Sequence, residues 1–155
     1  MTDERFSADD RAEIIETCTK MTYYIDERRW ADLHEIFTQT ITLDYVGVFG
    51  GAPTDTPRTD YVRNAERLLG NLDATQHQVS GHLVSGSGDE ARCISQVVAT
   101  HVKPNNSGGP LWTSGGQYDM GLRRGEDGWR ISSVRAVQRW CTGNREVMRL
   151  GKRDV

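Results

Sequence analysis

Residues 91–102, ARCISQVVATHV, decide the fold, because apolar and polar side chains alternate along them with the period of a β-strand. Three further runs of similar length accompany this one, at residues 75–84, 112–123 and 129–140. Turns rich in glycine or proline, at residues 86–88, 104–110 and 125–128, separate the four runs. Long strands joined by such turns predict an antiparallel sheet.

The helical signals lie in the first half of the chain. Ser7, followed three residues later by Asp10, resembles a capping box at a helix start. The apolar residues after it recur at the spacing of one helix face, at Ile14, Cys18, Met21 and Ile25. A second, short helix is expected near Trp30 and a third over residues 58–69. Helices gathered before the strands predict an α+β fold, and we expect a single domain over residues 1–155.

The composition excludes several classes of function. The net charge is −3 and no Lys/Arg cluster is present, so we expect neither nucleic-acid nor membrane-surface binding. The polar start MTDERFSADD is unlike a signal peptide, and no apolar run approaches the length of a membrane span. The three cysteines are widely spaced and odd in number, which is typical of reduced thiols and predicts a cytoplasmic protein.

Three strands each place one polar ring on an otherwise apolar face. By residue parity these rings are Tyr45, His77 and His101. The apolar residues that share their faces are Ile41 and Leu43, Val79 and Leu83, and Cys93, Val97 and Ala99, respectively. Asp26 lies at the shoulder of the first helix's apolar stripe, from where a carboxylate can reach between helix and sheet. Taken singly, each residue also fits a structural role.

The segment 24–30, YIDERRW, followed by Asp32 and Leu33, resembles the helix-end signature of SnoaL-like domains of the nuclear-transport-factor-2-like superfamily. In motif order it is most similar to the scytalone dehydratases. The resemblance continues at residues 43–45, 75–77, 101, 127–129 and 139–140, and so covers about residues 8–141.

The resemblance implies a cone-shaped, curved, mostly antiparallel sheet, an α+β barrel whose helices close a pocket. It further implies an acid–base dyad of Asp26 and His101, a second histidine at His77, and a tyrosine at Tyr45 that holds a water. Two positions depart from the family pattern: Ile25 replaces a second tyrosine, and Tyr118 replaces an amide residue.

These residues predict an elimination of water or a proton shift without cofactor or metal. His101, oriented by Asp26, would act as general base, and His77 would protonate the leaving hydroxyl. Tyr45 or Tyr118 would stabilise an enolate. The substrate would be a small hydrophobic cyclic carbonyl or hydroxyl compound. The residues expected to contact it are Tyr24, Tyr118, Trp112, Val79 and Val97.

Several alternatives remain open from the sequence. The same dyad could serve a polyketide cyclase, a double-bond isomerase or a dehydrohalogenase, and His77, His101 and Asp26 could nominally bind a metal. Asp119 would take part only if a bulge near residues 115–116 turned it inward. A binding or dimerisation module is the alternative from another class. Apolar outer residues at 94, 98 and 102 predict a homo-oligomer, either a dimer or a trimer.

Overall fold

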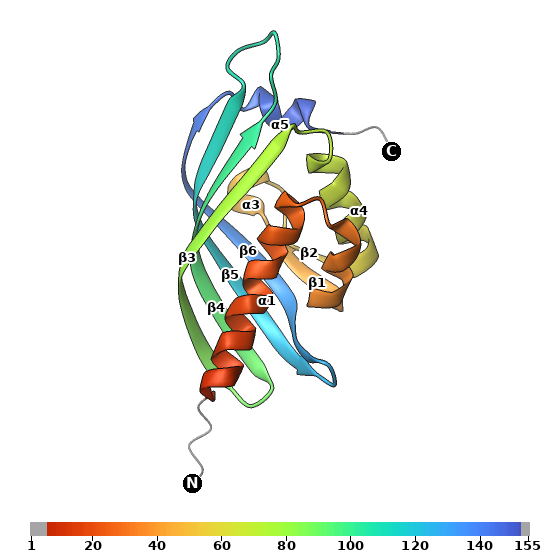
Figure 1. Ribbon diagram of the computed structural model, residues 1–155, viewed down its shortest axis with the longest axis vertical. Coiled ribbons are helices and arrows are strands. Elements are labelled where there is room, and N and C mark those ends of the chain that lie inside the picture. Colours follow the sequence, from red (N-terminus) through yellow and green to blue (C-terminus); the bar gives the residue numbers. More distant parts are fainter. Residues whose placement is uncertain (1–5, 153–155) are drawn as a thin grey trace.

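The computed structural model describes residues 6–152 and consists of one curved sheet with helices on its concave side (Figure 1). The helices are α1 Ala8–Asp26, η1 Trp30–Asp32, α2 Leu33–Ile36, α3 Val46–Phe49, α4 Arg58–Leu69 and α5 Glu146–Leu150. The strands are β1 Phe37–Asp44, β2 Thr54–Pro57, β3 Ala74–Ser87, β4 Glu90–Val102, β5 Leu111–Gly125 and β6 Gly128–Gly143. The α+β fold predicted from the sequence is confirmed.

The six strands lie in the order β2-β1-β6-β5-β4-β3. All neighbours pair antiparallel except β1 and β6, which are parallel. The sheet is not closed, because β2 and β3 form its two free edges. The four predicted strand runs correspond to β3 through β6; each strand begins one residue earlier than predicted, and all but β4 end two or three residues later.

Helix α1 forms where its cap and its apolar stripe predict it. The Ser7 hydroxyl accepts a hydrogen bond from the Asp10 backbone N–H, and the Asp10 carboxylate accepts one from the Ser7 backbone N–H, so both halves of the capping box are present. The residues of the stripe are all buried: Ile14, Cys18, Met21 and Ile25. The stripe holds α1 across the concave face of the sheet.

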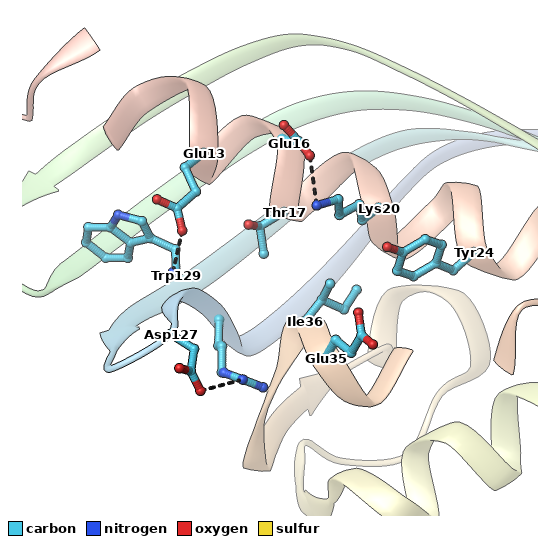
Figure 2. A pocket seen from close by; sticks show the side chains of 10 residues that line it. Glu13, Glu16, Thr17, Lys20, Tyr24, Glu35, Ile36, Asp127 and Trp129 are labelled. Atoms are coloured by element: carbon cyan, nitrogen blue, oxygen red, sulfur yellow. Dashed lines mark hydrogen bonds and ion pairs between the residues drawn. The ribbon is translucent and has the colours of Figure 1, made fainter. Parts of the chain in front are cut away.

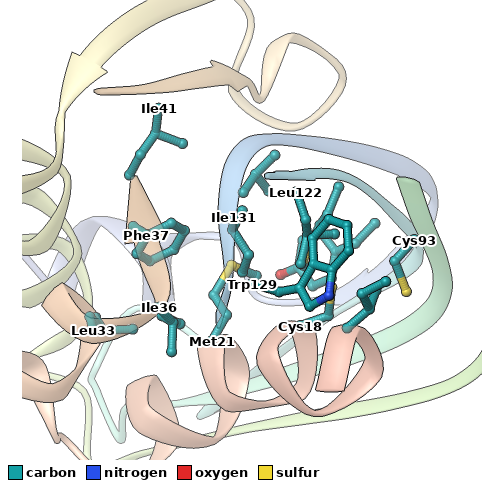
Figure 3. Packing of buried hydrophobic residues seen from close by; sticks show 14 of the residues in the cluster. Cys18, Met21, Leu33, Ile36, Phe37, Ile41, Cys93, Leu122, Trp129 and Ile131 are labelled. Carbon is teal, nitrogen blue, oxygen red and sulfur yellow. The ribbon is translucent and has the colours of Figure 1, made fainter. Parts of the chain in front are cut away.

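The core fills the space between α1, α2 and the inner face of the sheet (Figure 3). Cys18 and Met21 of α1 lie beside side chains of β5 and β6, among them Leu122 and Ile131. Phe37, at the start of β1, is fully buried and contacts the ring of Tyr61 edge-on, with centroids 4.8 Å apart. Each such apolar side chain contributes about 1.5–3 kcal/mol by leaving water.

Residue parity holds along β4 and fails midway along β3. On β4 the inner residues alternate as predicted, and His101 is buried with them. On β3 the pairing register shifts between Ser80 and Leu83, at Gly81, whose φ is 63°. The bulge reverses the faces beyond it, so Leu83 is 71% exposed. The predicted placement of Leu83 on the face of His77 is therefore wrong.

Candidate active site

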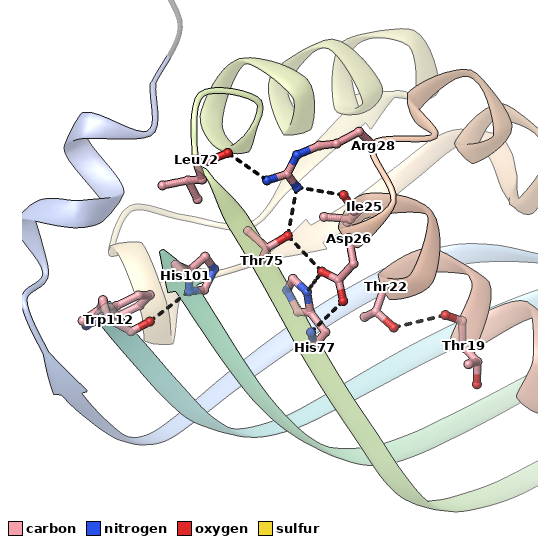
Figure 4. Close-up of polar contacts among 10 residues, drawn as sticks. All are labelled: Thr19, Thr22, Ile25, Asp26, Arg28, Leu72, Thr75, His77, His101 and Trp112. Atoms are coloured by element: carbon pink, nitrogen blue, oxygen red, sulfur yellow. Dashed lines mark hydrogen bonds and ion pairs between the residues drawn. The ribbon is translucent and has the colours of Figure 1, made fainter. Parts of the chain in front are cut away.

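Asp26 is the last residue of α1, and its carboxylate meets the beginning of β3 (Figure 4). Oδ1 accepts hydrogen bonds from the Thr75 hydroxyl (2.9 Å) and from Nδ1 of His77 (2.7 Å). Oδ2 accepts one from the backbone N–H of His77 (2.7 Å). A carboxylate at a helix C-terminus faces the negative end of the helix dipole, and these three donors offset that cost.

The pKa of Asp26 lies below its usual value. Burial alone raises this pKa, but the hydrogen bonds and the positive charge offered by His77, together with the Thr75 hydroxyl, outweigh the burial. Asp26 is therefore ionised at neutral pH. The His77 and Asp26 side chains are only 6% and 16% exposed, so bulk water screens the pair weakly.

The pairing of Asp26 corrects the dyad expected from the sequence. The imidazole bonded to Asp26 belongs to His77, whereas Nδ1 of His101 faces the carbonyl oxygen of Trp112 at 3.3 Å. The reason is the order of the strands. Helix α1 ends over the edge strand β3, while His101 lies one strand further in, paired with Thr75. The carboxylate reaches the β3 histidine first.

The hydrogen bonds fix where each histidine carries its proton. An ionised carboxylate and a carbonyl oxygen only accept, so Nδ1 is the donor in both His77 and His101. In each neutral ring Nε2 is then unprotonated. The two rings lie edge to face, with centroids 5.9 Å apart. Burial lowers the pKa of His101 to about 4, which keeps that ring neutral at physiological pH.

Three buried tyrosines interact with one another and remain protonated: Tyr45 and Tyr61 share a hydrogen bond, and Tyr118 lies within electrostatic reach of Tyr45 and Asp26. Tyr45 precedes α3 and Tyr118 lies on β5, while Tyr61 lies on α4. Burial raises the pKa of Tyr45 to about 12. Burial also raises the pKa values of Tyr61 and Tyr118, with the charge of Asp26 adding to the rise at Tyr118. All three therefore present neutral O–H donors.

The remaining expected contacts divide into two groups. Val79 on β3 and Val97 on β4 pair with each other on the inner face of the sheet. The next inward-facing pair along these two strands is His77 with Ala99. Trp112 lies against the ring of His101, with centroids 5.2 Å apart, but belongs to a separate small core cluster with Leu72 and Val147. We expect Tyr45, His77 and His101 to line one apolar cavity, and this stays a prediction.

Tyr24 does not join this site. It lines a groove of about 450 Å³ between α1, α2 and the β5–β6 hairpin (Figure 2). Two residues along a helix are about 200° apart, so Tyr24 and Asp26 lie on opposite flanks of α1. The groove is lined mainly by charged side chains, several already paired, such as Glu16 with Lys20.

Asp119 faces outward, as parity predicted. Both of its oxygens accept hydrogen bonds from Arg92 on the outer face of the sheet, at 2.7 and 2.6 Å. A register shift does occur at residues 115–116, but Gly115 pairs with Trp140 and Gly116 with Gln138. The extra residue therefore belongs to β6, and the alternation along β5 is unchanged.

The nominal metal triad is not supported by the geometry. Nδ1 of His77 and Oδ1 of Asp26 are engaged with each other. Among residues 6–152, no group of three or more His, Cys, Asp or Glu side chains is arranged to hold a metal ion. Within the same range, no helix is both long and apolar enough to cross a bilayer.

Sequence reasoning missed two contributors to the site. Tyr61 shares the buried face of α4 with Val62 and Ala65, and that helical spacing was its available signal. Arg28 follows α1 and donates to the Thr75 hydroxyl at 2.9 Å. No periodicity marks a residue in a helix-to-helix loop, so Arg28 entered the sequence analysis only as part of the segment 24–30, without a role of its own.

Comparisons with known proteins identify the family and the fold. The SnoaL-like domain family matches residues 7–135. The chain belongs to this family. The protein Kfla4162 of Kribbella flavida is 32% identical in sequence, and its crystal structure superimposes with a TM-score of 0.86, covering 91% of this chain and 97% of that one. The uncharacterized protein Rv2910c of Mycobacterium tuberculosis is 29% identical over 136 residues, which cover 85% of this chain and 86% of Rv2910c.

More distant structures share the fold of this SnoaL-like protein. A Novosphingobium aromaticivorans protein, provisionally named a scytalone dehydratase, superimposes with a TM-score of 0.76 at 21% identity, covering 92% of this chain and 91% of that one. Other structural neighbours carry dehydratase and dehydrochlorinase names. The nuclear-transport-factor-2-like fold expected from the sequence is thus confirmed, with lyase names recurring among its neighbours.

Proposed function

We propose that this SnoaL-like protein is a cofactor-free lyase that removes water from a small, uncharged, hydrophobic cyclic compound carrying a carbonyl and a hydroxyl group. The observation that carries the proposal is the 2.7 Å contact between Oδ1 of Asp26 and Nδ1 of His77. In the neutral ring this contact places the proton on Nδ1, so that Nε2 can accept a proton while a buried carboxylate lies behind the ring, which is the arrangement of a general base.

The reaction balances with His77 as the only proton carrier. Nε2 takes a proton from the carbon next to the substrate carbonyl, and the electrons of that C–H bond form an enolate. The enolate then expels the hydroxyl on the next carbon, and the His77 imidazolium returns its proton to the departing oxygen. One C–H and one C–O bond break, a C=C bond forms, and water leaves. Asp26 stays ionised and stabilises the imidazolium throughout.

The tyrosines support the assignment of an enolate. Tyr45 and Tyr118 keep their protons because burial raises their pKa values, so each can donate a hydrogen bond to a negatively charged oxygen. His101 stays neutral and contributes polarity without charge. The paired valines on the inner face, Val79 and Val97, supply apolar surface beside these donors. A neutral, largely apolar substrate matches such a set of side chains.

The test uses proton abstraction, which precedes the loss of water. The protein would be incubated in D₂O with a panel of cyclic ketones, with and without a β-hydroxyl group, and followed by NMR. We expect deuterium to enter next to the carbonyl and, in β-hydroxy compounds, an unsaturated product to form. His77→Asn should lower both rates by about 10²–10⁴-fold. Tyr24→Phe, in the groove on the opposite flank of α1, is the matched control and should not change them.

The products separate the related reactions. A double-bond shift without loss of water would identify an isomerase that uses the same base. A ring closure would identify a cyclase. If no ketone exchanges deuterium but one binds the natural protein, the proposal fails and the binding-module alternative replaces it.

A further inference from the structure

Arg28 adopts a backbone conformation that arginine rarely takes. Its φ of 58° is the only positive value among the non-glycine residues from 6 to 152. The residue lies just past α1, where glycine usually takes this left-handed conformation. For a residue with a side chain the conformation is strained, because the Cβ atom lies too close to the following carbonyl oxygen. The contacts of the arginine side chain must therefore offset a strain that glycine would avoid.

The guanidinium of Arg28 joins the end of α1 to the beginning of β3 (Figure 4). Nη1 donates to the carbonyl oxygen of Ile25 (3.0 Å) and to the hydroxyl of Thr75 (2.9 Å). Nη2 donates to the carbonyl oxygen of Leu72 (3.2 Å). The planar fork of an arginine can serve several acceptors at once, which a lysine ammonium does less well.

The contact with Thr75 fixes the direction of a hydrogen-bond chain. An arginine only donates, so the Thr75 oxygen is the acceptor in that bond. A hydroxyl has a single hydrogen, and that hydrogen is then left to point at Oδ1 of Asp26, 2.9 Å away. The same Oδ1 accepts Nδ1–H of His77. The chain runs in one direction, from Arg28 through Thr75 to Asp26.

We propose that Arg28 is a positioning residue for the Asp26–His77 pair and acts through the hydroxyl of Thr75. It holds the Thr75 hydrogen toward Asp26, and the carboxylate is thereby held with Oδ1 facing the imidazole and Oδ2 facing the backbone N–H. The consequence for catalysis rests on the function proposed above, whereas the positioning does not. The titratable or charged groups around the carboxylate come from four elements: Arg28, His77, His101 and Tyr118.

The test follows the ionisation of Asp26 in substrate-free protein, by ¹³C NMR of its carboxyl carbon. Thr75→Val removes the hydroxyl with little change of shape, and Arg28→Gly removes the guanidinium while relieving the backbone strain. Since the Thr75 hydrogen bond lowers the pKa of Asp26, both variants should raise it. Thr75→Ser keeps the hydroxyl and should titrate like the natural protein. Arg29→Gln, which removes the neighbouring exposed charge, is the matched control and should leave the Asp26 titration unchanged.

Thermal unfolding separates positioning from a merely structural role. A lower melting temperature with an unshifted Asp26 titration in both Thr75→Val and Arg28→Gly would overturn the proposal. If Arg28→Gly does not fold, Thr75→Val against Thr75→Ser carries the test alone. Where deuterium exchange is measurable, Thr75→Val should slow it roughly tenfold, as expected for one hydrogen bond to a charged group. A shifted titration in a protein that exchanges no ketone would refute the lyase while supporting the positioning role.

Discussion

Replacing Asp26 with asparagine tests how the carboxylate fixes the proton of His77, because the amide has nearly the same shape but only one acceptor oxygen. In the natural protein Oδ1 accepts from Nδ1 of His77 at 2.7 Å, and Oδ2 accepts from the backbone N–H of His77, also at 2.7 Å. An amide nitrogen in place of Oδ2 would face that backbone donor, which cannot give up its hydrogen.

The imidazole, by contrast, can change its tautomer. We therefore expect the amide oxygen to take the backbone N–H and the amide nitrogen to point at Nδ1. The ring of His77 would then carry its proton on Nε2, where it cannot accept a proton from substrate. Loss of general-base catalysis costs about 10²–10⁴-fold in rate, so deuterium exchange should slow by this factor in Asp26→Asn.

Two measurements check the reasoning. The ¹⁵N chemical shifts of the His77 ring report its tautomer directly, and exchange of substrate protons in D₂O reports the rate. Asp119→Asn is the matched control, because that carboxylate binds Arg92 on the outer face of the sheet. Exchange close to the natural rate in a folded Asp26→Asn protein, or a His77 ring still protonated at Nδ1, would refute the argument.

Three further outcomes are expected. The pKa of His101 is lowered from 6.5 to about 4, so the unfolded state binds more protons than the folded state between these pH values. The free energy of unfolding should therefore fall by about 3 kcal/mol as the pH drops through this window. Urea titrations of His101→Gln should no longer show this pH dependence. A Cβ at Gly116 would lie 1.8 Å from the Val137 carbonyl oxygen, so Gly116→Ala should lower the denaturation midpoint by the equivalent of about 2–3 kcal/mol, unlike Gly109→Ala, which meets nothing within 4 Å. A homo-oligomer built on the outer strand face should appear in light scattering at micromolar concentration, and a charge at the 71% exposed Leu83 should weaken it.

The tyrosines show what periodicity predicts and what it omits. Parity along β5 correctly placed Tyr118 inward and Asp119 outward, because an uninterrupted strand has a period of two. Tyr45 was counted as part of a strand, but β1 ends at Asp44 and Tyr45 precedes α3. Tyr61 comes from α4, and a helical pattern reports only that a residue is buried, not which polar groups it meets.

The sequence by itself determined the class of fold, the capped helix that delivers Asp26, and the inward faces of the two histidines, because these follow from local periods of 3.6 and 2 residues and from capping chemistry. Only the tertiary structure decided which histidine receives the carboxylate. That choice depends on where α1 ends above the sheet and on which strand forms the edge, and both are set by packing between segments far apart in the chain. The tertiary structure likewise decided the reversal of the β3 faces at Gly81 and the hydrogen bond from Arg28 to Thr75. A bulge and a long-range hydrogen bond leave no periodic pattern in the sequence.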